Sequence, residues 1–445
     1  MMREPVFQLL PRPARMDLAG KRLLVLGLGD TGLSAARWAE SRGARVRVAD
    51  TRNNPPRHFA GDVRLGAFTP ALLEDVDLAC ISPGLPLSNP LIGEALARGI
   101  PVLGDIELFA WENRAPVLAI TGTNGKSTVT ALVGHLLKEG GSDAEVAGNI
   151  SPPVLDAAMK RRTAPAAWVL ELSSYQLETT WSLAPRAAVM LNLSEDHLDR
   201  YASIREYGAA KARIFQGDGV QVLNRDDAAS LGMRLPGRRT ATFGLDGAPD
   251  FGVREDWLVK GEARIARVSA LTIHGGHNVS NVLAACALAH AFGIELDKLA
   301  SGLDSFRGLP HRLELVRERN GVRWYDDSKG TNVGATIAAL RGLGRKAVLI
   351  LGGEGKGQDF AALRPAVQNF TSRVLLIGRD TPLIEAALAG LGTERCPTLE
   401  GAVQRAAELA RPGEAVLLSP ACASFDMFRD YRQRGEVFAA AVRAL

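Results

Sequence analysis

The sequence predicts an α/β protein of three domains whose sheets are mostly parallel. Three blocks of the chain each alternate short apolar strand patterns with helix patterns, which is typical of parallel sheets covered by helices. A chain of 445 residues corresponds to about two to four domains of ordinary size. Gly and Pro interrupt both periodicities at 308–312, so we expect a linker there. The predicted domains are residues 1–107, 108–308 and 309–445.

The first block opens with an apolar strand at 21–26, followed by a glycine-rich turn and a helix at about 33–42. A second strand at 44–49 ends at Asp50, and a third at 78–81 precedes a Ser-Pro-Gly turn. The later blocks repeat this alternation. Their expected strands are 117–120, 168–172, 187–193, 346–351, 373–377 and 415–418, and their clearest helices are 126 to about 138 and 281–290.

The composition excludes several classes of protein. A net charge of +4 is small for this length, so no basic arm for nucleic acid is indicated. The four cysteines form no CxxC pair and fit neither a zinc site nor a disulfide framework, which predicts free buried thiols. No apolar run reaches about 18 residues and no apolar signal core follows the first residues, so we expect a cytoplasmic protein without a membrane partner.

One glycine-rich stretch has the pattern of a phosphate-binding loop. The strand at 117–120 is followed by Thr-Gly-Thr-Asn-Gly and then by Lys126 and Ser127 at the start of a helix. Backbone N–H groups and the positive end of such a helix attract phosphate oxygens. Lys126 is placed for the β- and γ-phosphates of a nucleotide, and Ser127 for Mg²⁺. The match is imperfect, because Ile120 stands where the common pattern has its first glycine.

A second glycine-rich turn, Gly27–Gly32, also joins a strand to a helix and fits G-x-G-x-x-G. Asp50 ends the next strand, and this combination alone indicates a dinucleotide such as NAD. No constellation for hydride transfer is visible elsewhere in the chain. The loop itself favours only a diphosphate near a helix N-terminus, so the diphosphate of a UDP-sugar satisfies it equally well.

Three further residues carry the chemistry of a metal site. Glu171 ends an apolar strand, and a carboxylate that faces a phosphate loop is placed to hold Mg²⁺. His197 lies in a loop rich in acids, although a lone histidine is more often a surface or core residue than a ligand. Ser203–Glu206 has the pattern of a capping box that starts a helix, on which Tyr207 and Lys211 share one face. On the residues alone, an exposed position is the default for Lys211.

Six stretches of the chain form an ordered set of motifs. They are Thr121–Thr128, Glu171–Glu178, Asn192–Tyr201, His277–Asn281, Asp327–Asn332 and Ser419–Asp426. Together they resemble the Mur ligase family, and the phosphate loop also resembles that of folylpolyglutamate synthetase. The likeness extends from Gly27 to Gly435 and is closest to the glutamate-adding member. It implies a Rossmann-like UDP-binding N-terminal domain, a central P-loop ATPase-like domain with a mostly parallel sheet, and a C-terminal Rossmann-like α/β domain for the amino acid.

The resemblance implies ATP, two Mg²⁺ ions and a CO₂-derived carbamate on Lys211. A carbamate supplies an oxygen ligand where an ammonium repels Mg²⁺, and the amine must lose its proton to react with CO₂. The implied catalytic residues are Lys126, Glu171, His197 and Lys211, and the implied metal ligands are Ser127, Glu171, His197 and Lys211. The implied ATP-binding residues are Gly122, Thr123, Asn124, Gly125, Lys126, Ser127, Thr128, Asn278, Asn281, Arg312, Asp327 and Lys329.

The resemblance also assigns residues to the other two substrates. The implied UDP-substrate residues are Leu28, Asp30, Thr31, Asp50, Thr51, Arg52, Gly84, Asn149 and His197. The implied glutamate-binding residues are Thr331, Lys356, Ser424, Phe425 and Tyr431. Lys356 supplies a positive charge for a substrate carboxylate. The stretch Gly352–Gly357 lacks a Lys-Ser step into a helix, so we reject it as a second nucleotide loop.

The implied activity is ATP-dependent addition of D-glutamate to UDP-N-acetylmuramoyl-L-alanine through an acyl phosphate, in cytoplasmic peptidoglycan precursor synthesis. We expect small-molecule substrates, no nucleic-acid or membrane partner, and a monomer. The choice of D- over L-glutamate rests on family likeness alone. A folylpolyglutamate synthetase-like ligase, an NAD oxidoreductase and a nucleotide-regulated binding protein are the alternative hypotheses.

Overall fold

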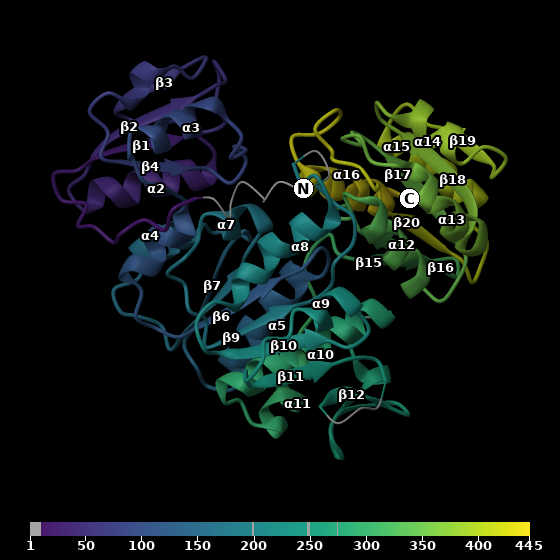
Figure 1. The fold of residues 1–445 in the computed structure, drawn as a ribbon. Helices are drawn as coiled ribbons and strands as arrows, with labels where there is room; N and C mark the ends of the chain where they lie inside the picture. Colours follow the sequence, from purple (N-terminus) through teal and green to yellow (C-terminus); the bar gives the residue numbers. More distant parts are fainter. Residues whose placement is uncertain (1–9, 198–199, 247–249, 274) are drawn as a thin grey trace. The chain divides into compact units, whose positions relative to one another are not determined.

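The computed structural model describes residues 10–197, 200–246, 250–273 and 275–445 (Figure 1). The chain divides into two compact units, each of which is described by itself. The first unit holds the chain up to residue 254 together with 258–265 and 283–302, and the second holds 255–257, 266–282 and 303–445. Among the described residues, none of the helices has both the length and the apolar character that a bilayer crossing requires. The four cysteines are free and buried, as predicted.

The N-terminal domain contains a five-stranded parallel sheet of order β3-β2-β1-β4-β5, drawn in purple and dark blue in Figure 1. Because helices pack on it, its central strands are buried apolar runs. The strands are β1 (Arg22–Leu26), β2 (Arg45–Asp50), β3 (Asp62–Leu65), β4 (Leu78–Ile81) and β5 (Val102–Leu103). The helices are α2 (Asp30–Ser41), η1 (Pro70–Leu73), α3 (Pro90–Ala97) and α4 (Asp105–Glu112).

The central domain contains a nine-stranded sheet of order β14-β13-β12-β11-β10-β9-β6-β8-β7, in which β6 to β11 are parallel. The strands are β6 (Val117–Thr121), β7 (Ala144–Gly148), β8 (Ala167–Glu171), β9 (Ala187–Met190), β10 (Val220–Asn224), β11 (Thr240–Phe243), β12 (Phe251–Arg254), β13 (Trp257–Lys260) and β14 (Ala263–Arg267). The helices are α5 (Lys126–Glu139), α6 (Val154–Lys160), α7 (Ser174–Glu178), α8 (Ile204–Ala212), η2 (Arg213–Phe215), α9 (Ala228–Gly232), η3 (Val268–Ala270), α10 (Gly276–Phe292) and α11 (Leu296–Ser305).

The C-terminal domain contains a six-stranded sheet of order β15-β16-β20-β17-β18-β19. Only β15 and β16 pair antiparallel, and the other neighbours are parallel. The strands are β15 (Glu314–Arg319), β16 (Val322–Asp326), β17 (Ala347–Gly352), β18 (Thr371–Ile377), β19 (Thr393–Arg395) and β20 (Ala415–Leu418). The helices are α12 (Val333–Gly342), η4 (Phe360–Leu363), α13 (Arg364–Phe370), α14 (Thr381–Ala387), α15 (Leu399–Leu409) and α16 (Tyr431–Ala444).

The predicted fold class, three α/β domains with mostly parallel sheets, is confirmed. The strands predicted at 78–81 and 415–418 have the predicted bounds. The first helix begins at Asp30, three residues before the prediction, because Gly29 is its N-cap and Thr31 and Gly32 already belong to its first turn. The predicted linker at 308–312 contains neither helix nor strand.

Candidate active site

The phosphate loop lies between β6 and α5, where its conformation depends on glycine. Gly122 and Gly125 have φ values of 153° and 86°, which only glycine adopts without strain. A Cβ on Gly122 would also lie 2.8 Å from Leu191 Cβ. Asn192 follows the neighbouring strand β9 and accepts from the backbone N–H of Asn124 at 2.8 Å. The glycines therefore allow the loop to turn closely into the start of α5, an arrangement that binds anions.

Two lysines share a single carbonyl in this loop. Lys126 Nζ donates to the carbonyl oxygens of Gly122 and Thr123 at 2.9 and 2.7 Å. Lys211 Nζ donates to the same Gly122 oxygen at 2.8 Å. Burial lowers the pKa of Lys211 well below its usual value, and the charge of Lys126 lowers it further, against opposing contributions from Asp196 and Glu171. Two neighbouring ammonium groups repel each other, so Lys211 readily becomes a neutral amine.

Helix α8 carries Lys211 into the interior, where it is 1% exposed rather than on the surface. Its Nζ lies 4.5 Å from the ring centroid of Tyr207, so these two side chains share one helix face as predicted. Ser203 caps the helix by accepting from the Glu206 N–H at 3.2 Å. The second half of the predicted capping box is wrong, because the Glu206 carboxylate accepts from the N–H of Ala202.

Glu171 ends β8 at the same sheet edge, directly opposite Ile120 of β6. The residue is 2% exposed. Asn149 Nδ2 donates to Glu171 Oε1 at 2.7 Å, and the Asn149 N–H donates to the Glu171 carbonyl at 2.8 Å. Asn149, predicted as a contact for the UDP-substrate, thus orients the carboxylate predicted to hold Mg²⁺. Its contact with the substrate stays a prediction.

His197 lies in the loop after β9 with a left-handed backbone, at φ 57°. Its Nδ1 forms a hydrogen bond of 2.7 Å with the Tyr175 hydroxyl, and its Nε2 lies 3.7 Å from Asp196 Oδ2. Tyr175 and Asp196 were not predicted as site residues, although both lie in the motifs that identify the family. The two residues of that motif that follow His197 lie outside the described part of the chain.

The donor set suits a magnesium nucleotide. Ser127 is buried in the first turn of α5, where it offers a hydroxyl, and Glu171 offers a carboxylate held by Asn149. Hard oxygen donors of these kinds are the ligands that Mg²⁺ prefers. Lys126 and the start of α5 supply the positive charge that a triphosphate needs. The residues present therefore fit both ATP and Mg²⁺.

The predicted UDP residues of the N-terminal domain gather at the carboxyl ends of β1, β2 and β4. Asp50 is buried and accepts from the Leu28 N–H at 2.7 Å and from Arg52 Nε at 2.8 Å. The Arg52 guanidinium, with this hydrogen bonding, lowers the pKa of Asp50 to about 2. Asp30 forms an exposed ion pair with Arg57. Thr31, Thr51 and Gly84 belong to the same three strand-to-loop junctions.

The other predicted ATP residues lie in the second unit, where Asn281 Nδ2 donates to Asn278 Oδ1 at 3.2 Å. Asp327 is buried and accepts from the Ser419 hydroxyl at 2.8 Å, and burial raises its pKa to about 7. Lys329 Nζ lies 5.2 Å from the ring centroid of Tyr431. The positive charge of Arg312 opposes the effect of burial on the pKa of Asp327. At His277, burial lowers the pKa to about 4, and the charge of Arg312 acts in the same direction.

Two residues that sequence reasoning missed hold this part of the second unit together. His311 Nδ1 lies 2.7 Å from Asp326 Oδ2, and this bond raises the pKa of His311. Arg434 is 1% exposed and donates to the carbonyl oxygens of Ser328 and Cys422 at 2.8 and 3.1 Å. His311 lies in the stretch interpreted only as a linker, and Arg434 lies on α16, three residues after Tyr431, where no local motif indicates a buried arginine.

The predicted glutamate residues lie in segments that follow the carboxyl ends of β16, β17 and β20, and the last two strands are neighbours in the sheet. Strand order reverses there, because the chain leaves β17 towards β18 and returns from β19 to β20, and ligands of open α/β sheets bind at such points. Lys356 has a φ of 52°, and its Nζ lies 5.4 Å from the ring centroid of Phe425. Ser424 is buried, whereas Phe425 is 64% exposed. Thr331 donates its N–H to the Lys329 carbonyl at 2.9 Å.

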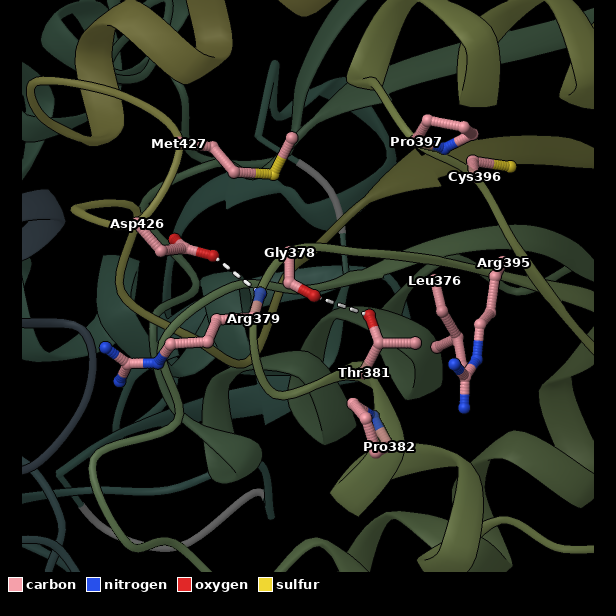
Figure 2. A pocket seen from close by; sticks show the side chains of 10 residues that line it. All are labelled: Leu376, Gly378, Arg379, Thr381, Pro382, Arg395, Cys396, Pro397, Asp426 and Met427. Atoms are coloured by element: carbon pink, nitrogen blue, oxygen red, sulfur yellow. Dashed lines mark hydrogen bonds between the residues drawn. The ribbon is translucent and has the colours of Figure 1, made fainter.

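A cavity of about 760 Å³ opens elsewhere in this domain, near the ends of β18 and β19 (Figure 2). Figure 2 shows Asp426 directed towards the Gly378 turn, where it accepts from the Arg379 N–H at 2.8 Å. The guanidinium of Arg379 pairs with Glu354 at 3.2 Å, and Arg395 pairs with a carboxylate as well. Because its cations already face carboxylates, we assign this cavity no ligand.

Family models match most of the chain. The model described as Mur ligase MurD-like, N-terminal domain, matches residues 21–104, the Mur ligase middle domain matches 120–289, and the Mur ligase, glutamate ligase domain, matches 311–422. The chain belongs to the Mur ligase family. The matched stretches fall inside the three predicted domains, whose boundaries stay predictions.

Curated relatives resemble this Mur ligase over nearly their whole length. A UDP-N-acetylmuramoylalanine–D-glutamate ligase from Nitrosospira multiformis is 52% identical over 97% of this chain and 97% of its own. One of the same name from Thiobacillus denitrificans is 52% identical over 97% of this chain and 98% of its own.

Solved structures of the family share the fold at low identity. MurF from Acinetobacter baumannii has a TM-score of 0.62 at 18% identity, with 96% of this chain and 91% of that chain covered. The UDP-N-acetylmuramate–alanine ligase of Thermotoga maritima has a TM-score of 0.61 at 18% identity, with 95% and 99% covered.

Proposed function

We propose that this chain is an ATP-dependent ligase that joins D-glutamate to UDP-N-acetylmuramoyl-L-alanine in peptidoglycan precursor synthesis, and that releases ADP and phosphate. One observation carries the proposal: Lys126 and Lys211 meet on one carbonyl of the phosphate loop, beside Glu171. Relatives that are 52% identical over nearly the whole chain bear the name of that activity, which supports the choice of substrates.

The reaction begins at the carboxylate of the alanyl substrate. A carboxylate oxygen attacks the γ-phosphorus of ATP, so that an acyl phosphate forms and ADP leaves. The amine of glutamate then attacks the acyl carbon, the phosphate departs with the electrons of the broken C–O bond, and the nitrogen loses a proton. Lys126 offsets charge on the transferring phosphoryl group. Mg²⁺, when bound by Ser127 and Glu171, supplies Lewis-acid stabilisation of the same oxygens.

Lys211 serves this site as a carbamate. Its neutral amine attacks CO₂, an N–C bond forms, and one proton is released to solvent. Burial and the nearby charge of Lys126 favour the neutral amine that this addition needs. The resulting anion would supply an oxygen ligand for a second Mg²⁺, and His197 would be the other residue that holds this ion. Without this modification, Lys211 would offer no oxygen ligand at this position.

The pocket that we propose for glutamate lies at the carboxyl ends of β17 and β20, where the strand order reverses. A glutamate acceptor carries two carboxylates, and Lys356 and the buried Ser424 offer a cation and a hydroxyl donor there. An uncharged side chain would leave the buried Ser424 hydroxyl without a carboxylate partner, whereas Lys356 is exposed and contributes by attraction to the substrate's charge, so glutamate is favoured over uncharged amino acids. Lys356→Ala should therefore raise the KM for glutamate much more than the KM for ATP.

Phosphate release tests the whole proposal. With UDP-N-acetylmuramoyl-L-alanine, D-glutamate should support ATP-dependent release, and L-glutamate, D-alanine and lysine should not. Use of L-glutamate in place of D-glutamate would indicate a ligase for the other enantiomer, and use of a folate acceptor would indicate a folylpolyglutamate synthetase-like enzyme. ATP binding without turnover would indicate a binding protein. We also propose a monomer that acts in the cytoplasm, and sedimentation of the purified chain tests its oligomeric state.

A further inference from the structure

Tyr175 contacts His197, the predicted histidine of the active site, at the imidazole nitrogen Nδ1. The Tyr175 hydroxyl and His197 Nδ1 form a hydrogen bond of 2.7 Å, and their ring centroids are 4.9 Å apart. The His197 side chain is 42% exposed. A ring this exposed keeps a single orientation only if a neighbour holds it, because free rotation about its side-chain bonds is otherwise favoured by entropy.

Tyr175 itself is firmly placed. Helix α7, on which it lies, starts with a complete capping box between Ser173 and Gln176. The guanidinium of Arg200 lies 4.1 Å from the Tyr175 ring centroid, and Arg200 pairs with Glu178, which is three residues further along the same helix. The charge of Arg200 over the ring and its anchor on α7 both restrict the tyrosine. Tyr175 is therefore a fixed point from which His197 can be oriented.

The bond at Nδ1 decides which ring nitrogen faces the site. With Nδ1 engaged by Tyr175, Nε2 is the nitrogen directed towards Asp196, at 3.7 Å from Oδ2. Histidines that bind cations generally use one nitrogen while the other is held by a hydrogen bond that fixes the ring and its tautomer. For Nε2 to offer its lone pair, Nδ1 must carry the proton and donate it to the Tyr175 oxygen.

We propose that Tyr175 is a positioning residue that orients His197 so that Nε2 faces the Mg²⁺ site. The proposal rests on the proposed function, in which His197 holds the second Mg²⁺. Tyr175 does not touch the substrate in this scheme, and it acts only through the imidazole. Loss of its hydroxyl should weaken metal binding about tenfold or more, and should leave the packing of the ring intact.

The test compares Tyr175→Phe with Tyr201→Phe. The first variant removes the hydroxyl bonded to His197, and the second removes a hydroxyl from the ring stacked on Tyr175, at a centroid distance of 6.1 Å. Nitrogen-15 NMR of the ligand-free protein reports the His197 ring nitrogens, assigned by their loss in His197→Gln. Electron paramagnetic resonance of free Mn²⁺ gives the metal affinity with a non-hydrolysable ATP analogue bound.

We expect the Nδ1 resonance to shift and the Mn²⁺ dissociation constant to rise about tenfold in Tyr175→Phe, with neither change in Tyr201→Phe. An unchanged Nδ1 resonance in Tyr175→Phe would overturn the proposal, and so would an unchanged Mn²⁺ affinity or equal effects of both variants. The NMR result is independent of turnover. Failure of the wild type to release phosphate would therefore count against the proposed function and not against this hydrogen bond.

Discussion

Two glycine-rich loops of this protein connect a parallel strand to a helix in the same way, but side chains of different chemistry contact them. Each joins a parallel strand to a helix, at Gly27–Gly32 in the N-terminal domain and at Gly122–Gly125 in the central domain. In the first loop, a carboxylate reaches in from the neighbouring strand, where Asp50 accepts from the Leu28 N–H. In the second loop, two lysines reach in and share the Gly122 carbonyl.

The difference shows that glycines shape a phosphate loop and that residues outside the loop decide its chemistry. Asp50 is neutralised by Arg52, so the N-terminal loop has little net charge, which suits a diphosphate that is bound and not transferred. Lys126 brings positive charge to the central loop, where phosphoryl transfer needs it, and this charge helps to keep the buried Lys211 neutral. Substitutions in the two loops should therefore affect different kinetic constants.

Lys126→Ala should have the largest effect. Removal of the cation that faces the transferring phosphoryl group should lower kcat at least about a thousandfold. The melting temperature should change little, because the hydrogen bonds from Lys126 to the Gly122 and Thr123 carbonyls stay within one loop. Lys138→Ala is the matched control, since Lys138 is an exposed lysine of the same helix. Near-normal turnover in Lys126→Ala would remove the central loop from the phosphate-binding role.

Lys211→Ala should come next, with a loss of about a hundredfold to a thousandfold. Short carboxylic acids should restore part of the activity, because they replace the carbamate oxygens in the space that the side chain leaves. Carbon-13 NMR with labelled bicarbonate should show a carbamate signal in the wild type that is missing from the variant. Full activity of the wild type in CO₂-free buffer would show that the unmodified lysine suffices.

The sequence was sufficient for the parts of this site that local patterns encode. A strand, a glycine turn and Lys126-Ser127 at a helix start specify the phosphate loop without any long-range information. Glu171 could be placed because it ends an apolar strand. The environment of Lys211 could not be read from its helix, whose pattern is compatible with an exposed lysine. Its burial depends on the Gly122 carbonyl, which is 89 residues away in the chain.

Other features were missed although a local signal existed. Strands β15 and β16 form a hairpin around Asn320-Gly321, both with positive φ, and Asn-Gly is the strongest sequence signal for such a turn. The partners of His311 and Arg434 could not be predicted, because Asp326 ends β16 and Cys422 lies in the loop after β20. Local patterns can therefore predict a chain reversal such as this hairpin, but they cannot predict contacts between separate elements.

Asp50→Asn tests the electroneutral loop. The KM for the UDP-substrate should rise about tenfold, and the KM for ATP should not change. Asp62→Asn is the control, because it loses a paired carboxylate on the same sheet.

The folded pKa of Asp50, about 2, lies below the ordinary value of 3.8, so its contribution to stability is present above about pH 3.8. It should amount to about 2 kcal/mol and disappear as the pH falls towards 2. Urea unfolding of wild type and variant between pH 3 and 7 measures this difference, and a constant difference would contradict it.

Arg57→Ala should have the smallest effect. The side chains of Arg57 and Asp30 are 51% and 62% exposed, and ion pairs this exposed contribute at most about 1 kcal/mol to stability. Asp30 also lies in the first turn of α2, where a diphosphate is expected and an uncompensated carboxylate would repel it. Arg57→Ala should therefore raise the KM for the UDP-substrate about two- to threefold at low salt, with a smaller effect at high salt, because ions screen exposed charges. The double variant Asp30→Ala, Arg57→Ala should recover the wild-type KM, since it removes both charges. Steady-state kinetics of the wild type, the two single variants and the double variant measure the coupling between Asp30 and Arg57. An equal rise in the KM for ATP would show that the two loops are not electrostatically independent.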